Sequence, residues 1–433
     1  KENVQVYVNE RIVRESGEEL IKYLYSIRAE DIVRIEVIPV GGVEHEASAQ
    51  GGIIKLTLRK QRDDGLEGSL RMRYGTRLND NPQQYIQPSL SINYRLAKFS
   101  LYTDITENRN KYYGYGIARR INKNGYSFES NWRQSSLKDS PTLRVGTIYD
   151  ISPRHSVGVE ANLAGYFPEK ERSSVVDTVF YNGALQGTIE SDYNYLNKHK
   201  NWNLSANYIA RFDTVGSTFK LLFDYVRTHP HTGGYVEVDH IIPGDAYTYR
   251  SNNESQNDLY SVTGDFDIRA GDNARVKTGF KYIFSQVDSW MKYEDLVGDI
   301  WVVRPDQTYD MVYDEHISAA YGRYTYTFDS KISVGVGLRV EHTYAMPAAT
   351  GVNNIERQNY FSFFPQADLI LPLGDSHQLI FNYARKIRRP SFWLLIPLRR
   401  PISETEVAVG NPKLKPSFSH EFSLNWVIRQ KYT

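Results

Sequence analysis

The chain has 433 residues, with 52 lysines and arginines against 51 aspartates and glutamates. This even balance argues against a nucleic-acid groove, so no nucleic-acid partner is expected. No run of 18 apolar residues is present, which excludes a membrane-spanning helix. Cysteine is absent and tyrosine is unusually frequent, with 33 residues. Tyrosine suits surfaces that are apolar on one side and wet on the other.

Residues 1–62 combine short strands with the signal of one helix. An alternating strand begins at Val4, and Ser16 has capping-box spacing to Glu19 ahead of an apolar helical face. A second apolar strand starts at Ile32 and ends before Pro39. These elements predict a small α/β unit whose core is too small to be stable by itself.

The sequence pattern changes at the last strand of this unit, from a mixed α/β pattern to a series of hairpins. Gly51 and Gly52 open this strand, and Ile54 begins an alternation of apolar and polar residues that runs to Lys60. Past Gly65 the chain becomes a series of hairpins. We therefore place the junction of two domains here, between residues 1–62 and residues 63–433.

Residues 63–433 show a period of two with turns at regular distances. Short breaks recur roughly every 45 to 60 residues, for example at Ala97, Pro153, Gly216, Gly271, Asp329 and Gly374. Long polar segments join the strands at the other side, near 112–125, 168–198, 229–256, 290–312 and 345–358. Short turns on one side and long loops on the other are typical of an outer-membrane barrel. A soluble sandwich would turn every 8 to 12 residues or so.

The predicted fold is therefore dominated by β-structure: a transmembrane antiparallel β-barrel of about fourteen strands, with the small α/β unit at its N-terminal side. A mean hydropathy of -0.52 is compatible with this fold, because barrel strands carry polar residues at alternate positions. Aromatic residues near the strand ends suit the membrane interfaces. The competing interpretation is that they are core residues of a soluble sheet.

One segment, residues 288–315, has the composition of a ligand-contacting surface. Its aromatic residues lie among carboxylates, and they are Trp290, Tyr293, Trp301, Tyr309 and Tyr313. Aromatic rings beside carboxylates are suited to capturing sugars or peptides. An interfacial girdle with a solubilising loop explains much of the same composition.

The chain lacks the common catalytic motifs, including G-x-S-x-G, the Walker A loop and H-E-x-x-H. His229 and His231 flank a proline in a predicted external loop, and we interpret them as solvated rather than as metal ligands. We expect no enzymatic activity, no cofactor and no metal site.

Three stretches resemble the TonB-dependent outer-membrane receptor superfamily, especially its SusC-like group. The first resembles the C-terminal half of the plug domain and includes residues 6–9, 16–20 and 29–38. The second, residues 51–57, is similar to the closing strand of that plug. The third comprises residues 385–392 and the sequence GNPKLKP at residues 410–416, which is the most specific of them.

This resemblance implies a nutrient importer of the outer membrane of a Gram-negative bacterium. Its plug would fill the barrel, a TonB-type partner would supply energy, and a surface lipoprotein could cover the mouth. The nutrient would be a glycan, a peptide or a chelate. The alternative is a receptor, adhesin or assembly component with the same barrel but no transport. Because barrels of this superfamily have 22 strands, we expect the chain to be an internal part of such a receptor; the alternative is a complete barrel of about fourteen strands with a shortened plug.

Overall fold

The computed structural model describes the whole chain except a set of short segments. The residues outside the description are 1–3, 9–10, 14–19, 22, 25–26, 28, 30–31, 39, 49–50, 59–63, 78–82, 214–215, 241–245, 353–354, 375, 404–405 and 429–433. The predicted capping box at Ser16 and the domain boundary at residues 62 and 63 lie outside the described residues. Among the described residues, no helix combines the length and apolar character that crossing a bilayer requires.

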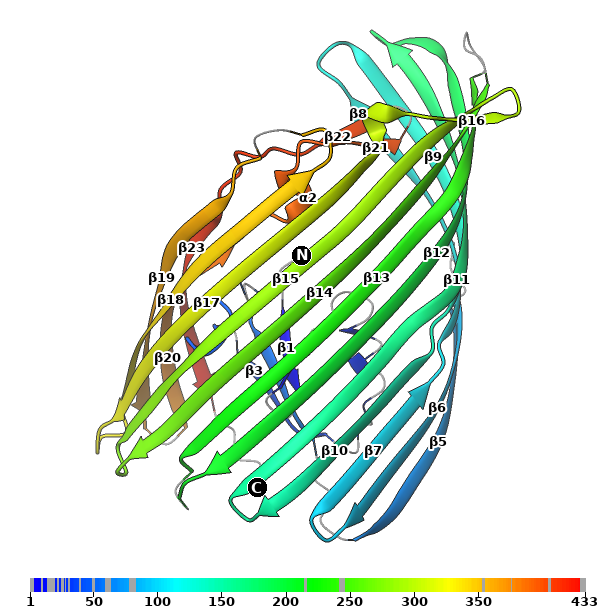
Figure 1. Cartoon of the computed structure of the whole chain (residues 1–433). Helices are drawn as coiled ribbons and strands as arrows, with labels where there is room; N and C mark the ends of the chain where they lie inside the picture. Colours follow the sequence, from blue (N-terminus) through cyan, green and yellow to red (C-terminus); the bar gives the residue numbers. More distant parts are fainter. Residues whose placement is uncertain are drawn as a thin grey trace.

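A large antiparallel sheet of tilted strands forms the wall of a barrel, as predicted (Figure 1). Its strands are β5 (Gly65–Arg77), β6 (Gln83–Leu96), β7 (Phe99–Thr106), β8 (Arg109–Ile121), β9 (Tyr126–Asp139), β10 (Thr142–Ser152), β11 (His155–Tyr181), β12 (Ala184–Arg211), β13 (Thr218–His240), β14 (Tyr247–Ala270), β15 (Ala274–Val297), β16 (Ile300–Val303), β17 (Tyr309–Thr327), β18 (Ser333–Ala349), β19 (Gln358–Leu373), β20 (His377–Arg388) and β23 (Ser417–Ile428).

β7 and β8 together form one strand with a local break, and so do β9 and β10. β7 and β8 are separated only by Glu107 and Asn108, and β9 and β10 only by Ser140 and Pro141. Asn108 and Ser140 exchange both backbone hydrogen bonds across the break, at 3.2 and 3.0 Å, so the pairing continues through it. With each pair counted once, and with the short strand β16 left out, the 17 strands that the described residues form in this sheet give fourteen that traverse the wall.

The outer face of the wall is apolar and the inner face is polar. On β18, Val334, Val336 and Leu338 are exposed on one face, while Arg339 and Glu341 on the other face are 2% exposed each. Apolar side chains left exposed in such a row are stable only against hydrocarbon. The period of two in the sequence therefore separates the lipid-facing side from the lumen.

Replacing Val336 with arginine tests the assignment of the outer face. Val336 is 53% exposed within the apolar row, so we expect the charge to lower the free energy of unfolding in lipid by about 2 kcal/mol or more. Val303 on β16 is a matched control because it is 40% exposed outside that row, and Val303→Arg is expected to change stability by less than about 0.5 kcal/mol. Urea unfolding in lipid vesicles measures both values. Equal effects of the two substitutions would contradict the assignment.

Most residues that were expected to form long external loops instead extend the strands. β11 has 27 residues and β12 has 28, and they are joined by a tight turn at Asn182 and Gly183. A tilted strand needs only about 9 to 11 residues to cross a bilayer. The loop prediction was wrong because a strand that is in water on both faces can carry the same polar residues as a loop. Backbone hydrogen bonds between neighbouring strands continue above the membrane.

The N-terminal unit contains a small sheet, called here the inner sheet, which lies within the barrel (Figure 1). Its strands lie in the order β2 (Arg11–Ile12), β1 (Gln5–Val8), β4 (Ile53–Leu58) and β3 (Ile32–Ile38). Its core gathers Val6, Val8 and Leu56 with Ile54 and Leu58 packed against them, which confirms the alternation of the closing strand. The apolar side chains of Val33, Ile35 and Val37 on β3 are exposed, so the core is as small as the sequence indicated.

The segment between β20 and β23, residues 389–416, folds over the mouth of the barrel and is called here the mouth segment. It contains α2 (Phe392–Leu395) and the hairpin of β21 (Arg399–Ser403) and β22 (Glu406–Val409) (Figure 1). Leu395 and Ile396 pack into a core cluster with wall residues of β15, β17 and β18. An ion pair of 2.6 Å joins Glu406 to Arg120 on β8.

Candidate functional site: the contact between the inner loop and the wall

Residues 40–48, called here the inner loop, leave the inner sheet after β3 and run along the inside of the wall. Gly41 allows this path, because a β-carbon at that position would lie 2.5 Å from the Ile53 side chain. His45 and Ala47 are buried, and the His45 ring meets Tyr7 of β1 edge-on at 5.0 Å between centroids. The inner loop is thus packed on both sides, against its own sheet and against the wall.

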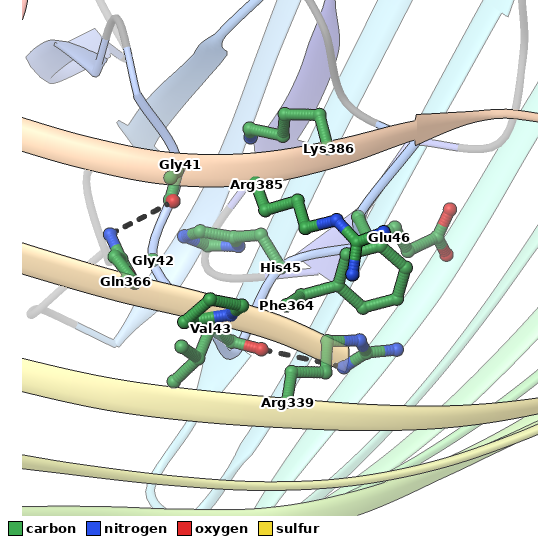
Figure 2. Close-up of a pocket in the computed structure, with 13 residues that line it drawn as sticks. Gly41, Gly42, Val43, His45, Glu46, Arg339, Phe364, Gln366, Arg385 and Lys386 are labelled. Carbon is green, nitrogen blue, oxygen red and sulfur yellow. Dashed lines mark hydrogen bonds between the residues drawn. The ribbon is translucent and has the colours of Figure 1, made fainter. Parts of the chain in front are cut away.

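Backbone groups of the inner loop bind three neighbouring wall strands (Figure 2). The Gln366 side chain on β19 donates to the carbonyl of Gly41 at 3.1 Å. The Arg339 guanidinium on β18 donates to the carbonyl of Val43 at 3.4 Å. The backbone N–H of Ile387 on β20 donates to the carbonyl of Ala47 at 3.1 Å, in the manner of a short extension of the sheet.

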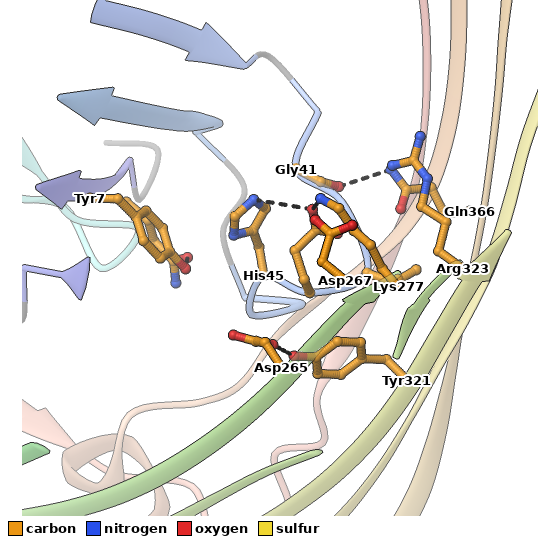
Figure 3. A network of polar contacts seen from close by, with 12 residues as sticks. Tyr7, Gly41, His45, Asp265, Asp267, Lys277, Tyr321, Arg323 and Gln366 are labelled. Atoms are coloured by element: carbon orange, nitrogen blue, oxygen red, sulfur yellow. Dashed lines mark hydrogen bonds and ion pairs between the residues drawn. The ribbon is translucent and has the colours of Figure 1, made fainter. Parts of the chain in front are cut away.

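Two ion pairs attach the same loop to β15. Lys277 donates to Glu44 at 2.7 Å, and Lys281 donates to Glu46 at 2.7 Å. Lys281 is only 6% exposed, so its ammonium lies in a weakly screened environment. Near the same loop, Asp265 accepts a hydrogen bond from Tyr321, and Figure 3 shows this pair together with Lys277 and His45.

The charges around the inner loop shift the pKa values of two of its side chains, which lie outside the membrane-spanning strands. Burial lowers the pKa of His45 to about 3, against the opposing effect of Glu44. Burial alone would raise the pKa of Glu44, but Lys277 and His45 hold it well below its usual range. The loop is therefore docked with a neutral imidazole and an ionised carboxylate.

Docking of the inner loop is expected to weaken in mild acid. Because the pKa of His45 is lowered from 6.5 to about 3, the undocked loop binds a proton below pH 6.5 that the docked loop does not. Docking therefore loses up to about 1.4 kcal/mol per pH unit between pH 6.5 and 4.5, and toward pH 4.5 the lowered pKa of Glu44 adds to the loss. Hydrogen exchange of residues 41–47 at pH 7 and pH 5 measures the loss. His45→Gln should remove this pH dependence, and an unchanged dependence in that variant would contradict the assignment.

A pocket of about 270 Å³ lies between the inner loop and the wall, and part of that volume is open solvent. Gly41, Val43 and His45 line it from the loop, and Arg339, Phe364 and Lys386 line it from the wall (Figure 2). The part of it that a water molecule can occupy is about 20 Å³, far below the volume of an ordinary small-molecule site. It is part of the packing contact between the inner loop and the wall. Within the described part of the chain, no three metal-ligating side chains come together.

A buried charge cluster lies next to this interface. Glu341 accepts from Arg339 at 2.6 Å and from Arg389, the first residue of the mouth segment, at 2.5 Å. Arg389 also donates to Thr343 at 3.2 Å. The period of two in the sequence places Arg339 and Glu341 on the polar face of one strand, but it does not reveal the cluster. The row of cations at residues 385–389 was the signal that could have indicated it.

The predicted junction residues lie at the closing strand and at the first wall strand. Gly52 has a positive φ of 79° just before β4, and its carbonyl accepts from the N–H of Gln5 at 3.1 Å. Gly51 lies in the preceding turn, Ile54 is in β4, and Gly65 begins β5. The residues that would join the two domains, 59–63, lie outside the described part of the chain, so the junction stays a prediction.

The five aromatic residues predicted to contact ligand are divided between two faces of the extended wall. Tyr293, Tyr309 and Tyr313 are buried on the inner face, at 8%, 4% and 6% exposure. Tyr309 and Tyr313 contribute to the core beneath the mouth segment, and Tyr293 packs with Tyr249. Trp290 lies on the opposite face of β15 from Tyr293, because the two residues are three positions apart on the strand. The Trp301 ring stacks on the Arg250 guanidinium, with 4.4 Å between the guanidinium carbon and the ring centroid. Their contact with a ligand stays a prediction.

The tilted antiparallel wall, its apolar outer face and its polar inner face define an outer-membrane β-barrel. The chain belongs to the outer membrane protein beta-barrel family, whose model matches residues 210–433. It is accordingly a protein of the outer membrane of a Gram-negative bacterium. No curated protein matches the sequence.

Solved structures with a similar arrangement include receptors and a translocator. The chain is similar to the ferric-catecholate import receptor Fiu from E. coli K12, with 8% identity, a TM-score of 0.30, and coverage of 97% of this chain and 82% of that one. The siderophore receptor PirA from Pseudomonas aeruginosa shows 12% identity, a TM-score of 0.25, and coverage of 88% and 86%. The translocator domain of the autotransporter NalP from Neisseria meningitidis shows 11% identity, a TM-score of 0.24, and coverage of 67% and 83%.

Proposed function

We propose that the protein is a gated outer-membrane transporter in which the inner sheet acts as a plug that blocks the lumen. The observation that carries the proposal is the docking of the inner loop on β15, β18, β19 and β20 by hydrogen bonds and ion pairs. Each such bond contributes only about 1 to 3 kcal/mol net. The loop is therefore held firmly at rest but can be released by a modest applied force.

The remaining parts of the proposal follow from the resemblance to TonB-dependent receptors of the SusC-like group. A TonB-type partner in the inner membrane pulls on the plug, and a glycan, peptide or chelate passes through the opened lumen. A surface lipoprotein acts as a lid. Uptake of the nutrient that survives deletion of the energising partner would contradict this part of the proposal.

An engineered disulfide between the inner loop and the wall tests whether the inner sheet is the gate. A β-carbon at Gly337 would lie 2.8 Å from a γ-carbon of Val43, so Val43→Cys with Gly337→Cys places two thiols within bonding reach. The chain contains no other cysteine. The pair is introduced together with Glu44→Gln and Glu46→Gln, which remove both ion pairs and loosen the loop.

Cells that carry the loosened protein are expected to become sensitive to vancomycin, which an intact outer membrane excludes. Oxidation of the engineered pair should restore resistance, and reduction should abolish it again. Each single cysteine in the loosened background is the control and should not respond to oxidant. If the loosened protein leaves cells resistant, the inner sheet is not the gate, and a non-transporting receptor, adhesin or assembly component becomes the better assignment.

A further inference from the structure

Above the lipid-facing band, the outer face of β12 changes from apolar to basic within a few residues. Trp202 and Leu204 are 49% and 41% exposed on this face. Side chains two residues apart lie on the same face of a strand, so Lys200 and Lys198 continue the face upward. Both lysines are exposed.

The neighbouring strand β11 brings two more cations to the same place because its register shifts between Tyr166 and Glu169. Beyond the shift, Lys170 lies opposite Leu196 and Arg172 lies opposite Asn194. Glu171, between them, points to the inner face, where it accepts from Gln134 at 2.6 Å and from Asn197 at 2.8 Å. Lys170 and Arg172 are consequently directed outward, and both are exposed.

These four cations, called here the basic patch, differ from other cations of the wall. Arg227 on the adjacent strand is paired with Asp258 at 2.7 Å, and Arg144 in the lumen is paired with Glu160 at 2.9 Å. Among the described residues, no carboxylate lies within 4.0 Å of any member of the basic patch. The positive charge of the patch is therefore available to a ligand.

We propose that the basic patch binds the phosphate groups of phosphorylated lipids in the outer leaflet. The patch continues directly from the lipid-facing surface, which places it at the level of the headgroups. Residues two apart on a strand are separated by about 7 Å, and neighbouring strands by about 5 Å, so two of these cations can reach one phosphate. Ionised donors form the strongest hydrogen bonds to phosphate, and cations at a membrane surface attract anionic headgroups. This lipid site is independent of the proposed transport function.

Native mass spectrometry of the full chain in detergent tests the proposal. The probes are lipid A that carries both phosphates and the same lipid after removal of its phosphates. The variant K170Q/R172Q/K198Q/K200Q removes the basic patch. The variant K123Q/K331Q/K413Q/K415Q makes the same charge change at exposed turns and loops elsewhere. Circular dichroism and heat-dependent gel migration check that both variants keep the barrel.

We expect the wild-type chain and the control variant to retain the phosphorylated lipid, with at least roughly tenfold weaker binding in the patch variant. The dephosphorylated lipid should bind all three equally and weakly. Retention of the phosphorylated lipid by a folded patch variant at wild-type affinity would overturn the proposal. Full displacement of the lipid by millimolar inorganic phosphate would also overturn it, because the site would then recognise a free anion.

Discussion

Glu341→Gln is expected to lower the free energy of unfolding by about 3 to 5 kcal/mol. Glu341 is 2% exposed and is the shared partner of two guanidinium groups, those of Arg339 and Arg389. Neutralising one member of a buried ion pair leaves an uncompensated buried charge. Here it leaves two cations close together in the lumen, so the loss is expected at the upper end of what single substitutions cause. Urea unfolding in lipid vesicles, followed by tryptophan fluorescence, measures it.

The same substitution in an exposed ion pair is the control. Glu129 pairs with Arg119 at 3.4 Å, and their side chains are 44% and 67% exposed. Glu129→Gln should change the free energy of unfolding by no more than about 1 kcal/mol, because water screens this pair. If Glu341→Gln also costs less than 1 kcal/mol, water enters the cluster and the arginines are not buried charges. Loss of Glu341 should further loosen the mouth segment, since Arg389 is its first residue.

Gly410→Ala is expected to release the mouth segment from the wall. A β-carbon at Gly410 would overlap the carbonyl group of Ile396, which is backbone and cannot move aside as a side chain could. The next residue, Asn411, donates its backbone N–H to the carbonyl of Leu394 at 2.6 Å. The close packing at Gly410 therefore also brings the two groups of this hydrogen bond together. We expect a loss of about 3 kcal/mol in the free energy that holds this segment in place. Hydrogen exchange of residues 391–398 and 410–416 measures that free energy.

Gly322→Ala is the matched control for this substitution, because a β-carbon at Gly322 meets nothing within 4 Å. It should leave hydrogen exchange in the mouth segment unchanged. Exposure of Leu395 and Ile396, which are at most 2% exposed at rest, should make the Gly410 variant sensitive to protease at the mouth while the wall stays intact. Protection as in the wild-type chain would show that the contact between Gly410 and Ile396 does not hold the segment.

The sequence predicts the wall well because lipid on one side and water on the other impose a period of two. The alternation from Val334 to Leu338 and the turns at Gly271 and Gly374 identify strands without knowledge of their neighbours. The ends of the strands were less predictable, since polar residues above the membrane do not distinguish a hydrated strand from a loop. This is why β11 and β12 run much further than expected.

The candidate site was less predictable because it joins residues far apart in sequence. Glu44 and Lys277 form one contact across more than 200 positions, and Val43 reaches Arg339 across a similar distance. Each of these residues has an ordinary local context, a polar loop or the polar side of a strand. Their meeting depends on where the inner sheet lies within the barrel. The conspicuous aromatic segment at 288–315 attracted a ligand hypothesis, yet three of its rings are packed as core.

The unequal lengths of the wall strands give the rim of the barrel a slope. β12 has 28 residues and β20 has 12, which correspond to about 90 Å and 40 Å along the strand axes. The tall side stands above the membrane as a screen, and the low side lies at β19, β20 and β23 (Figure 1). A large solute that approaches along the cell surface therefore meets the tall side as an obstacle and reaches the mouth from the low side. The mouth segment begins at the end of β20, on this low side of the rim.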